Sequence, residues 1–413
     1  MKFIHTADAH FGIENYGKID AKTGIHSRLL DFSRNFEHIV DYAIDNKVDF
    51  FLFCGDAYKT ANPTPTQQKL LAQHMLRLHA ARIPVVIVVG NHDHPLSFGK
   101  AHALDVFAYL PLDGFFVFSK PDLITLPTAS GTVQIVGIPW PLRNHVVTHQ
   151  SHHFKDHHEI ATYLSEKIGE VISSFAEKID PTLPAVLAGH LTVSSGIFSG
   201  SEKCAIYGTD PVFMPSQLAQ TAFDYVALGH LHGHQNLNAS GHPAVVYSGS
   251  CERVDFGERK ETKGFCVVTI HQEKASKKSS YEFIQLPTRP MVQIDVKLNA
   301  TGDQTEQILT ALTQHTIQDA IVKIVYHLPE GKSDTVDLGA IQNACQKALY
   351  LVGIFPVHKP APLRERRAAV KVDMDFATLL SHYFDSKENL KDRKAVLIEK
   401  AFALKQNLEQ VEN

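Results

Sequence analysis

The sequence predicts an α/β protein whose first part is a layered domain of strands and helices. Apolar runs of strand length alternate with segments of helical periodicity over residues 3–89, which is the order expected of a layered α/β domain. Polar turns end several of these runs, and a different pattern of shorter strands begins at residue 115. Because ligands bind beyond the carboxyl ends of strands in open α/β sheets, a site is expected at these turns.

Length and composition favour an ordinary cytoplasmic protein of two or three domains. The 413 residues exceed what one domain usually holds, and 44% hydrophobic residues allow a sizeable core. A net charge of -4 gives no general attraction to nucleic acid, although bound divalent metals would reverse the field locally. The five scattered cysteines form no CxxC pair, which indicates a reducing compartment and argues against thiolate zinc sites. We see no signal-peptide core and no apolar run long enough for a membrane span.

The first elements follow from hydrophobic periodicity. The run at 49–54 is continuously apolar, as expected of a strand covered on both faces. Pro63 and Pro65 open a second helix, and Pro95 stops the chain from continuing past the turn that follows 84–89. The elements expected here are strands at 3–4, 49–54 and 84–89, a helix over 28–46, and the helix opened by the two prolines.

From residue 115 a second sheet is expected. Short strands at 115–118, 123–126 and 133–136 indicate it. A helix over 159–179, strands at 185–188, 225–228 and 244–247, and a terminal hairpin from 264–270 and 281–284 are expected after them. The histidine-rich segment 145–158 is either an additional metal or phosphate site or a solvated loop, and we favour the loop. The stretch 192–216, rich in Ser, Gly and Thr, is expected to be a loop that could flank the site.

The last third of the chain predicts a small α+β domain and a helical tail. Val292, Ile294 and Val296 alternate strictly, which indicates a strand with one buried face. A helix near 303–315, a strand at 321–326, a helix near 338–350 and a strand near 352–357 follow. Two apolar helical stripes after residue 374 either pack on this protein or bind a partner. The domains expected are 1–286, 287–360, and 361–413 for the linker and tail.

Five polar turns, each directly after an apolar run, carry residues of the kinds that bind metals. Together they supply Asp8, His10, Asp56, Asn91, His190, His230 and His232. Carboxylate, amide and imidazole groups without sulfur suit Mn, Fe or Zn rather than a structural thiolate zinc site. Seven groups exceed what one open site needs, and they suit two metals about 3.5–4 Å apart with one bridging carboxylate. Such a pair can hold a phosphate and activate a water.

His92 differs from the predicted ligands. It lies between Asn91 and Asp93, so it can approach the site while a carboxylate holds its ring, and Asp93 is therefore counted with the catalytic residues. This arrangement suits a general acid that protonates the leaving oxygen. Any one of these histidines alone could be a buried residue whose ring makes ordinary hydrogen bonds within the protein. That explanation is weak for the whole set, because five turns at the ends of five apolar runs all carry such residues.

The order and spacing of these turns resemble the calcineurin-like metallophosphoesterase superfamily. The resemblance implies an αββα sandwich of four layers with two central sheets. More narrowly, the chain resembles the SbcD-type nuclease subunits of DNA double-strand-break repair. The stretches that carry this narrower resemblance are Met1 to Gly12, Pro63 to Pro65, Tyr247 to Ser250, Phe256, and Lys263 to Phe265.

The resemblance implies a ligand set. One metal would be held by Asp8, His10, Asp56 and His232, and the other by Asp56, Asn91, His190 and His230. His92 would be the transition-state acid, and Mn would be the preferred metal, with Mg, Fe or Zn as alternatives. Lys59 stands where some relatives have a histidine; it either contacts a phosphate as a point charge or is a surface lysine.

The resemblance also implies an exo- or endonuclease that acts on DNA ends. The small α+β domain would be a capping domain, the tail helices would bind an SbcC-type coiled-coil ATPase, and the protein would form a homodimer. Two alternatives remain. One is a small-molecule phosphodiesterase or protein phosphatase of the same superfamily, and the other is a non-enzymatic scaffold that keeps its metals as staples.

Overall fold

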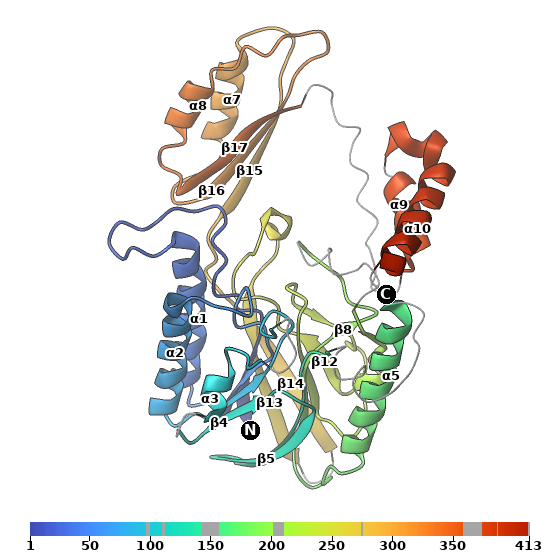
Figure 1. The fold of residues 1–413 in the computed structure, drawn as a ribbon. Helices are drawn as coiled ribbons and strands as arrows, with labels where there is room; N and C mark the ends of the chain where they lie inside the picture. The colour runs from blue at the N-terminus through green and yellow to red at the C-terminus, as the bar shows by residue number, and fades with distance from the viewer. Residues whose placement is uncertain are drawn as a thin grey trace.

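A computed structural model describes residues 1–95, 100–109, 112–142, 157–200, 210–273, 276–357, 374–385 and 387–411 (Figure 1). Most of the histidine-rich segment 145–158, the middle of the 192–216 stretch and the linker before residue 374 lie outside these residues. The cysteines Cys54, Cys251, Cys266 and Cys345 are free and buried. Within the described ranges, no helix has the length and apolar character that a membrane crossing requires.

The first sheet has the strand order β14-β13-β1-β2-β3-β4. Its strands are β1 (Lys2–Thr6), β2 (Phe50–Phe53), β3 (Val85–Val88), β4 (Phe115–Phe118), β13 (Gly264–Glu273) and β14 (Ser276–Gln285). The strands β1 to β4 run parallel, and the hairpin of β13 and β14 joins β1 in antiparallel pairing. The prediction that 115–118 belongs to the second sheet is wrong, because β4 pairs with β3 in the first.

The second sheet has the order β11-β12-β10-β7-β6-β5. Its strands are β5 (Asp122–Thr128), β6 (Gly131–Ile138), β7 (Ala185–His190), β10 (Tyr225–Gly229), β11 (Gln235–Asn236) and β12 (Ala244–Tyr247). The four strands β6, β7, β10 and β12 run parallel, and the two outer strands are antiparallel to their neighbours. The 192–216 stretch contains the short pair β8 (Thr192–Val193) and β9 (Val212–Phe213) and helix α6 (Pro215–Leu218).

The two sheets face each other and helices cover their outer sides, as predicted. Alternation along β2 directs Phe50 and Leu52 into the core between the sheets, and Phe51 and Phe53 towards the helices. Helices α1 (Ser27–Asp45), α2 (Pro65–Ala80) and α3 (Asp105–Tyr109) pack on the first sheet, and α5 (His157–Ala176) and α6 pack on the second (Figure 1). The result is an αββα sandwich of four layers.

A three-stranded parallel sheet builds a separate core beyond the sandwich. It contains β15 (Met291–Lys297), β16 (Ile321–His327) and β17 (Tyr350–Val357), with α7 (Gln304–Thr313) and α8 (Leu338–Ala344) on one face. Helix α8 ends at Ala344, short of the predicted 338–350, and β17 begins at Tyr350. The tail forms α9 (Phe376–Asp385), the 3-10 helix η3 (Glu388–Arg393) and α10 (Lys394–Val411).

Candidate metal centre

All five predicted turns lie at carboxyl ends of parallel strands. Asp8 and His10 follow β1, Asp56 follows β2 and Asn91 follows β3, all in the first sheet. His190 ends β7, and His230 and His232 follow β10 in the second sheet. Because the sheets face each other, the two sets of turns meet at one edge of the sandwich, and the candidate site draws on both sheets.

Several of the predicted ligands have an unusual backbone conformation. Asp8, His10, Asp56 and His230 have positive φ angles of 53°, 43°, 56° and 102°. Residues other than glycine rarely adopt positive φ angles. Those that do concentrate at functional sites, where the neighbouring structure holds them in place. Here the N–H of Asp8 donates to the carbonyl of Gly55, and the N–H of His10 donates to the carbonyl of Asp56. The turns thus hold one another in the conformations that point their side chains inwards.

Two glycines are required by the close approach of these turns. A Cβ on Gly229 would lie 2.0 Å from the carbonyl oxygen of Cys54, and one on Gly90 would lie 2.2 Å from Oδ1 of Asp56. Real Cβ atoms do not approach other atoms so closely. Gly229 therefore allows the turns of the two sheets to approach each other, and Gly90 allows the same for two neighbouring turns of the first sheet.

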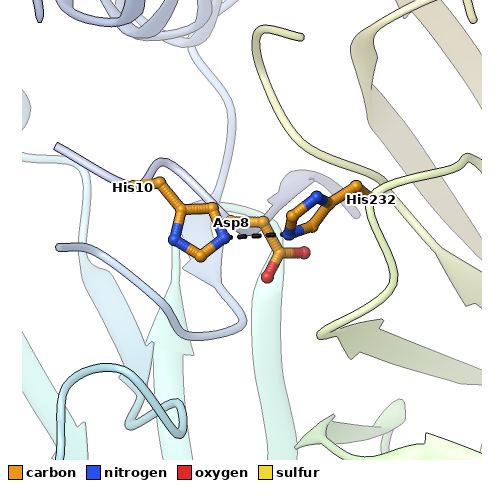
Figure 2. Close-up of side chains that lie close together, drawn as sticks. All are labelled: Asp8, His10 and His232. Carbon is orange, nitrogen blue, oxygen red and sulfur yellow. Dashed lines mark hydrogen bonds between the residues drawn. The ribbon is translucent and has the colours of Figure 1, made fainter. Parts of the chain in front are cut away.

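The first group of side chains contains Asp8, His10 and His232 (Figure 2). The Nε2 atoms of His10 and His232 point towards each other and lie 3.0 Å apart, and the carboxylate of Asp8 lies beside them. Nδ1 of His232 is 2.8 Å from Oε1 of Glu258 and donates to it. In the neutral ring the lone pair of Nε2 then points towards His10. Nδ1 of His10 is buried without a hydrogen-bond partner among the described residues.

The second group contains Asp56, Asn91, His190 and His230. Nδ1 of His190 donates to the carbonyl of Cys54 at 2.7 Å. Its Nε2 faces two acceptors, Oδ1 of Asn91 at 2.9 Å and Oδ2 of Asp56 at 3.5 Å. Nδ1 of His230 lies 3.2 Å from the same Asn91 oxygen. Lone pairs of His190, Asn91 and Asp56 therefore face one another, as the ligands of a common cation would.

The pKa values of Asp8 and His190 are both raised, so the site favours added positive charge. Burial raises the pKa of Asp8 to about 7, although His190 and His232 oppose the shift. Burial alone would lower the pKa of His190, but the carboxylates of Asp56 and Asp8 outweigh it and raise the pKa to about 9. The site attracts a proton to His190, and a divalent cation would supply the same compensation. The donor set thus fits metal binding: oxygen and nitrogen ligands, convergent lone pairs and buried ring nitrogens without partners.

Asp56 and Asp8 connect the two groups. Oδ2 of Asp56 lies 3.5 Å from Nε2 of His190 and 3.8 Å from Nε2 of His10. Asp8, Asp56 and His190 also form a triad whose ligand atoms lie within 4.8 Å of one another. All seven predicted residues are therefore brought together, and Asp56 lies between the two groups, where a bridging carboxylate is expected.

His92 lies at the open side of the site, but Asp93 does not hold it. The His92 side chain is 36% exposed, and its Nε2 is 4.0 Å from Oδ2 of Asp56. Its Nδ1 donates to the carbonyl of Lys59 at 3.0 Å. The carboxylate of Asp93 instead accepts hydrogen bonds from the backbone N–H groups of Asp56, Ala57, Tyr58 and Gly90. The expectation that Asp93 orients the His92 ring is wrong; Asp93 joins the turn after β2 to the turn after β3.

Three residues of the site were not predicted from the sequence. Glu258 contacts His232, Lys263 contacts Glu258, and the ring of Trp140 lies 4.9 Å from that of His230. Trp140 follows β6, so its place after a parallel strand was a usable signal. Glu258 lies in a charged segment with no ligand-like turn, and only the tertiary contact identifies it. Lys59 contributes its backbone carbonyl to His92, while its own side chain is exposed.

Comparison with known proteins shows the family of the chain. Residues 1–234, more than half of the chain, match the family model described as calcineurin-like phosphoesterase. The chain is 29% identical over 300 residues to a subunit of the SbcCD nuclease of Staphylococcus saprophyticus, an alignment that covers 72% of this chain and 71% of that protein.

Two solved structures are also similar. A dimetal phosphatase from Danio rerio has a TM-score of 0.38 and 12% identity, and the match covers 68% of this chain and 98% of that one. The protein TT1561 of Thermus thermophilus has a TM-score of 0.38 and 13% identity, with 68% of this chain and 97% of that one covered.

Proposed function

The chain belongs to the calcineurin-like phosphoesterase family, and we propose that it is a metal-dependent nuclease that hydrolyses phosphodiester bonds at DNA ends. The family makes it a hydrolytic enzyme. The observation that carries the proposal is the meeting of seven side chains with oxygen and nitrogen atoms suited to metal binding, with a partly exposed histidine beside them, at one edge of the sandwich. The similarity to an SbcCD nuclease subunit favours DNA as the substrate.

The proposed ligand sets follow the two groups of side chains. Asp8, His10, Asp56 and His232 would hold one divalent ion, most favourably Mn. Asp56, Asn91, His190 and His230 would hold the other. Two bound ions would polarise the phosphate and lower the pKa of a bound water.

The role proposed for His92 follows from its hydrogen bond and its exposure. Because Nδ1 donates to the carbonyl of Lys59, Nε2 is the atom left for the substrate. That nitrogen would protonate the leaving oxygen of the cleaved strand. Asp93 would act indirectly, by fixing the turn that carries His92 to the turn that carries Asp56.

The rest of the chain would supply substrate and partner contacts. We propose that 287–360 is a capping domain and that the tail from residue 374 binds a coiled-coil ATPase of the SbcC type, with the whole protein acting as a homodimer. Helices α9 and α10 pack on each other, with the rings of Phe376 and Phe402 5.3 Å apart. They leave Tyr383, Val396 and Leu404 exposed. An exposed apolar face on a helical pair suits a helical partner.

Cleavage of an end-labelled linear duplex in the presence of Mn tests the proposal. Wild type is compared with His92→Ala and Asp56→Ala, and bis-p-nitrophenyl phosphate serves as a general phosphodiester. Loss of duplex cleavage in both variants is expected. If wild type hydrolyses the small diester and leaves DNA intact, even with the ATPase partner added, the site belongs to a small-molecule phosphodiesterase or a protein phosphatase. A protein that binds metal and hydrolyses neither substrate would refute the enzymatic proposal.

A further inference from the structure

The ring of His232 is held by a carboxylate that lies outside the predicted ligand set. The side chain of Glu258 is completely buried, and its Oε1 accepts a hydrogen bond from Nδ1 of His232 at 2.8 Å. Its other oxygen, Oε2, lies 2.9 Å from Nζ of Lys263 and accepts from the N–H of Val254 at 2.8 Å. Both oxygens of this buried carboxylate are therefore engaged, and one of them is directed at a single ring nitrogen of His232.

Lys263 holds the same histidine from its backbone side. Its side chain is as buried as that of Glu258, and its ammonium donates to the carbonyl oxygen of His232 at 2.9 Å. The third partner of the ammonium is Oε2 of Glu261, also at 2.9 Å. Lys263 thus neutralises the buried Glu258 and contacts the residue that Glu258 orients, so that ring and backbone of His232 are fixed by one ion pair.

The turn that carries Glu258 is itself well anchored. It is the 3-10 helix η2 (Phe256–Glu258), which Asp255 caps through a hydrogen bond from the N–H of Gly257. Phe256 packs with Met291 and Ile321, at the start of two strands of the small sheet. The Glu258 carboxylate therefore lies on a well-anchored helix. A residue that orients a metal ligand has to be held rigidly in this way.

We propose that Glu258, with Lys263 as its counter-ion, is a positioning residue for His232. The carboxylate keeps the proton on Nδ1 and so presents the lone pair of Nε2 to the metal, while it also fixes the plane of the ring. Partners of this kind on the second nitrogen of a metal-binding histidine set both its tautomer and its basicity. The inference rests on the proposed role of His232 as a ligand.

The structure offers a matched pair of variants for the test. Glu258→Gln removes the charge and keeps the size of the side chain. Glu261→Gln removes the other carboxylate that contacts Lys263, and Glu261 is 27% exposed, whereas Glu258 is completely buried against His232. The two variants therefore separate the effect on His232 from the effect of weakening the lysine contacts.

Mn binding to the metal-free full-length protein is measured by calorimetry, with metal content after dialysis as a second readout. The residues proposed for the two ions differ, so only the site that includes His232 should weaken in Glu258→Gln, by about 10- to 100-fold. The site of Asn91, His190 and His230 should keep its affinity, which also shows that the protein is folded. Glu261→Gln should bind both ions as wild type does. If Glu258→Gln does not fold, Glu258→Asp, which keeps the charge and shortens the reach, should show the same selective loss.

Wild-type affinity at both sites of a folded Glu258→Gln protein would overturn the proposal, and so would equal weakening at both sites. Neither result depends on DNA. A protein that shows the selective loss and yet cleaves no DNA would leave the role of Glu258 standing while it refutes the nuclease proposal. Conversely, if the protein cleaves DNA and Glu258→Gln binds Mn as tightly as wild type does, only this inference is refuted.

Discussion

Nε2 of His10 and Nε2 of His232 lie 3.0 Å apart although 222 residues separate them in the chain. His10 follows a strand of the first sheet and His232 follows a strand of the second. Nδ1 of His232 already donates to Glu258. The two Nε2 atoms therefore need either a proton shared between them or a common cation. Their meeting is the direct consequence of two sheets that end at the same edge of the sandwich.

Metal binding should be visible in the fluorescence of Trp140, the one tryptophan of the chain. Its ring lies 4.9 Å from that of His230 and 6.1 Å from that of His190. A paramagnetic ion held by these histidines would quench the indole, so titration of the metal-free protein with Mn should lower its emission, and a chelator should restore it. Paired His190→Ala and His230→Ala substitutions should abolish the change. Quenching that persists in that variant would place the ion elsewhere.

Replacement of His92 should affect substrates unequally. General acid catalysis contributes about 10²- to 10⁴-fold when the leaving group is a poor one. A DNA alkoxide needs a proton, whereas p-nitrophenolate leaves without one. His92→Ala should therefore lower the rate of DNA cleavage by about that factor and the hydrolysis of bis-p-nitrophenyl phosphate much less. Rates on both substrates with the same enzyme preparation check this, and an equal loss on both would assign His92 to binding rather than proton transfer.

Gly229→Ala should disturb the site and the stability together. The added Cβ would lie 2.0 Å from the carbonyl of Cys54, in the backbone of the opposite sheet. Overpacking of this kind costs about 1–3 kcal/mol, and it would push His230 away from its neighbours. Chemical denaturation and Mn affinity should both report the loss. Gly233→Ala is the control from the same turn, because the nearest atom to its Cβ would be 3.9 Å away. Comparable losses in both variants would contradict the argument.

Stability should depend on pH through His74, a residue of α2 that contacts α1 and does not belong to the proposed metal ligands. Its Nε2 is 2.9 Å from Oγ of Ser33, and burial lowers the pKa of its ring from 6.5 to about 4. The folded state therefore keeps this ring neutral between pH 4 and 6.5, where the unfolded chain binds a proton. His74 thus makes the free energy of unfolding fall as the pH is lowered through this window, by up to about 1.4 kcal/mol per pH unit.

The corresponding variant is His74→Gln, which keeps a polar partner for Ser33 and has no charge to gain. Its free energy of unfolding should fall less steeply than that of wild type as the pH drops from about 6.5 to about 4, and the two slopes should agree at neutral pH. Urea denaturation of the metal-free proteins across this range measures both slopes. Parallel curves throughout the window would show that His74 titrates normally in the folded protein.

Much of the architecture was predictable because helices and strands depend on residues that are close together in the sequence. A continuous apolar run identified β2, helical spacing identified α1, and strict alternation identified β15. The turns that follow apolar runs pointed to one edge of the sandwich. The assignment of 115–118 to the second sheet failed because a short apolar run does not say which neighbour it pairs with. Only the parallel register of Val85 with Phe115 decides that.

By itself, the sequence determined which residues could bind metal and that they lie at strand ends, because strand periodicity and turn chemistry depend on neighbours along the chain. The tertiary structure alone decided what these side chains meet. It directed Asp93 to backbone N–H groups rather than to His92, gave His92 the carbonyl of Lys59, and brought Glu258 to His232. Such contacts depend on which strands are neighbours, on positive φ angles and on glycines that allow close approach. They arise from packing between distant segments, which no local pattern encodes.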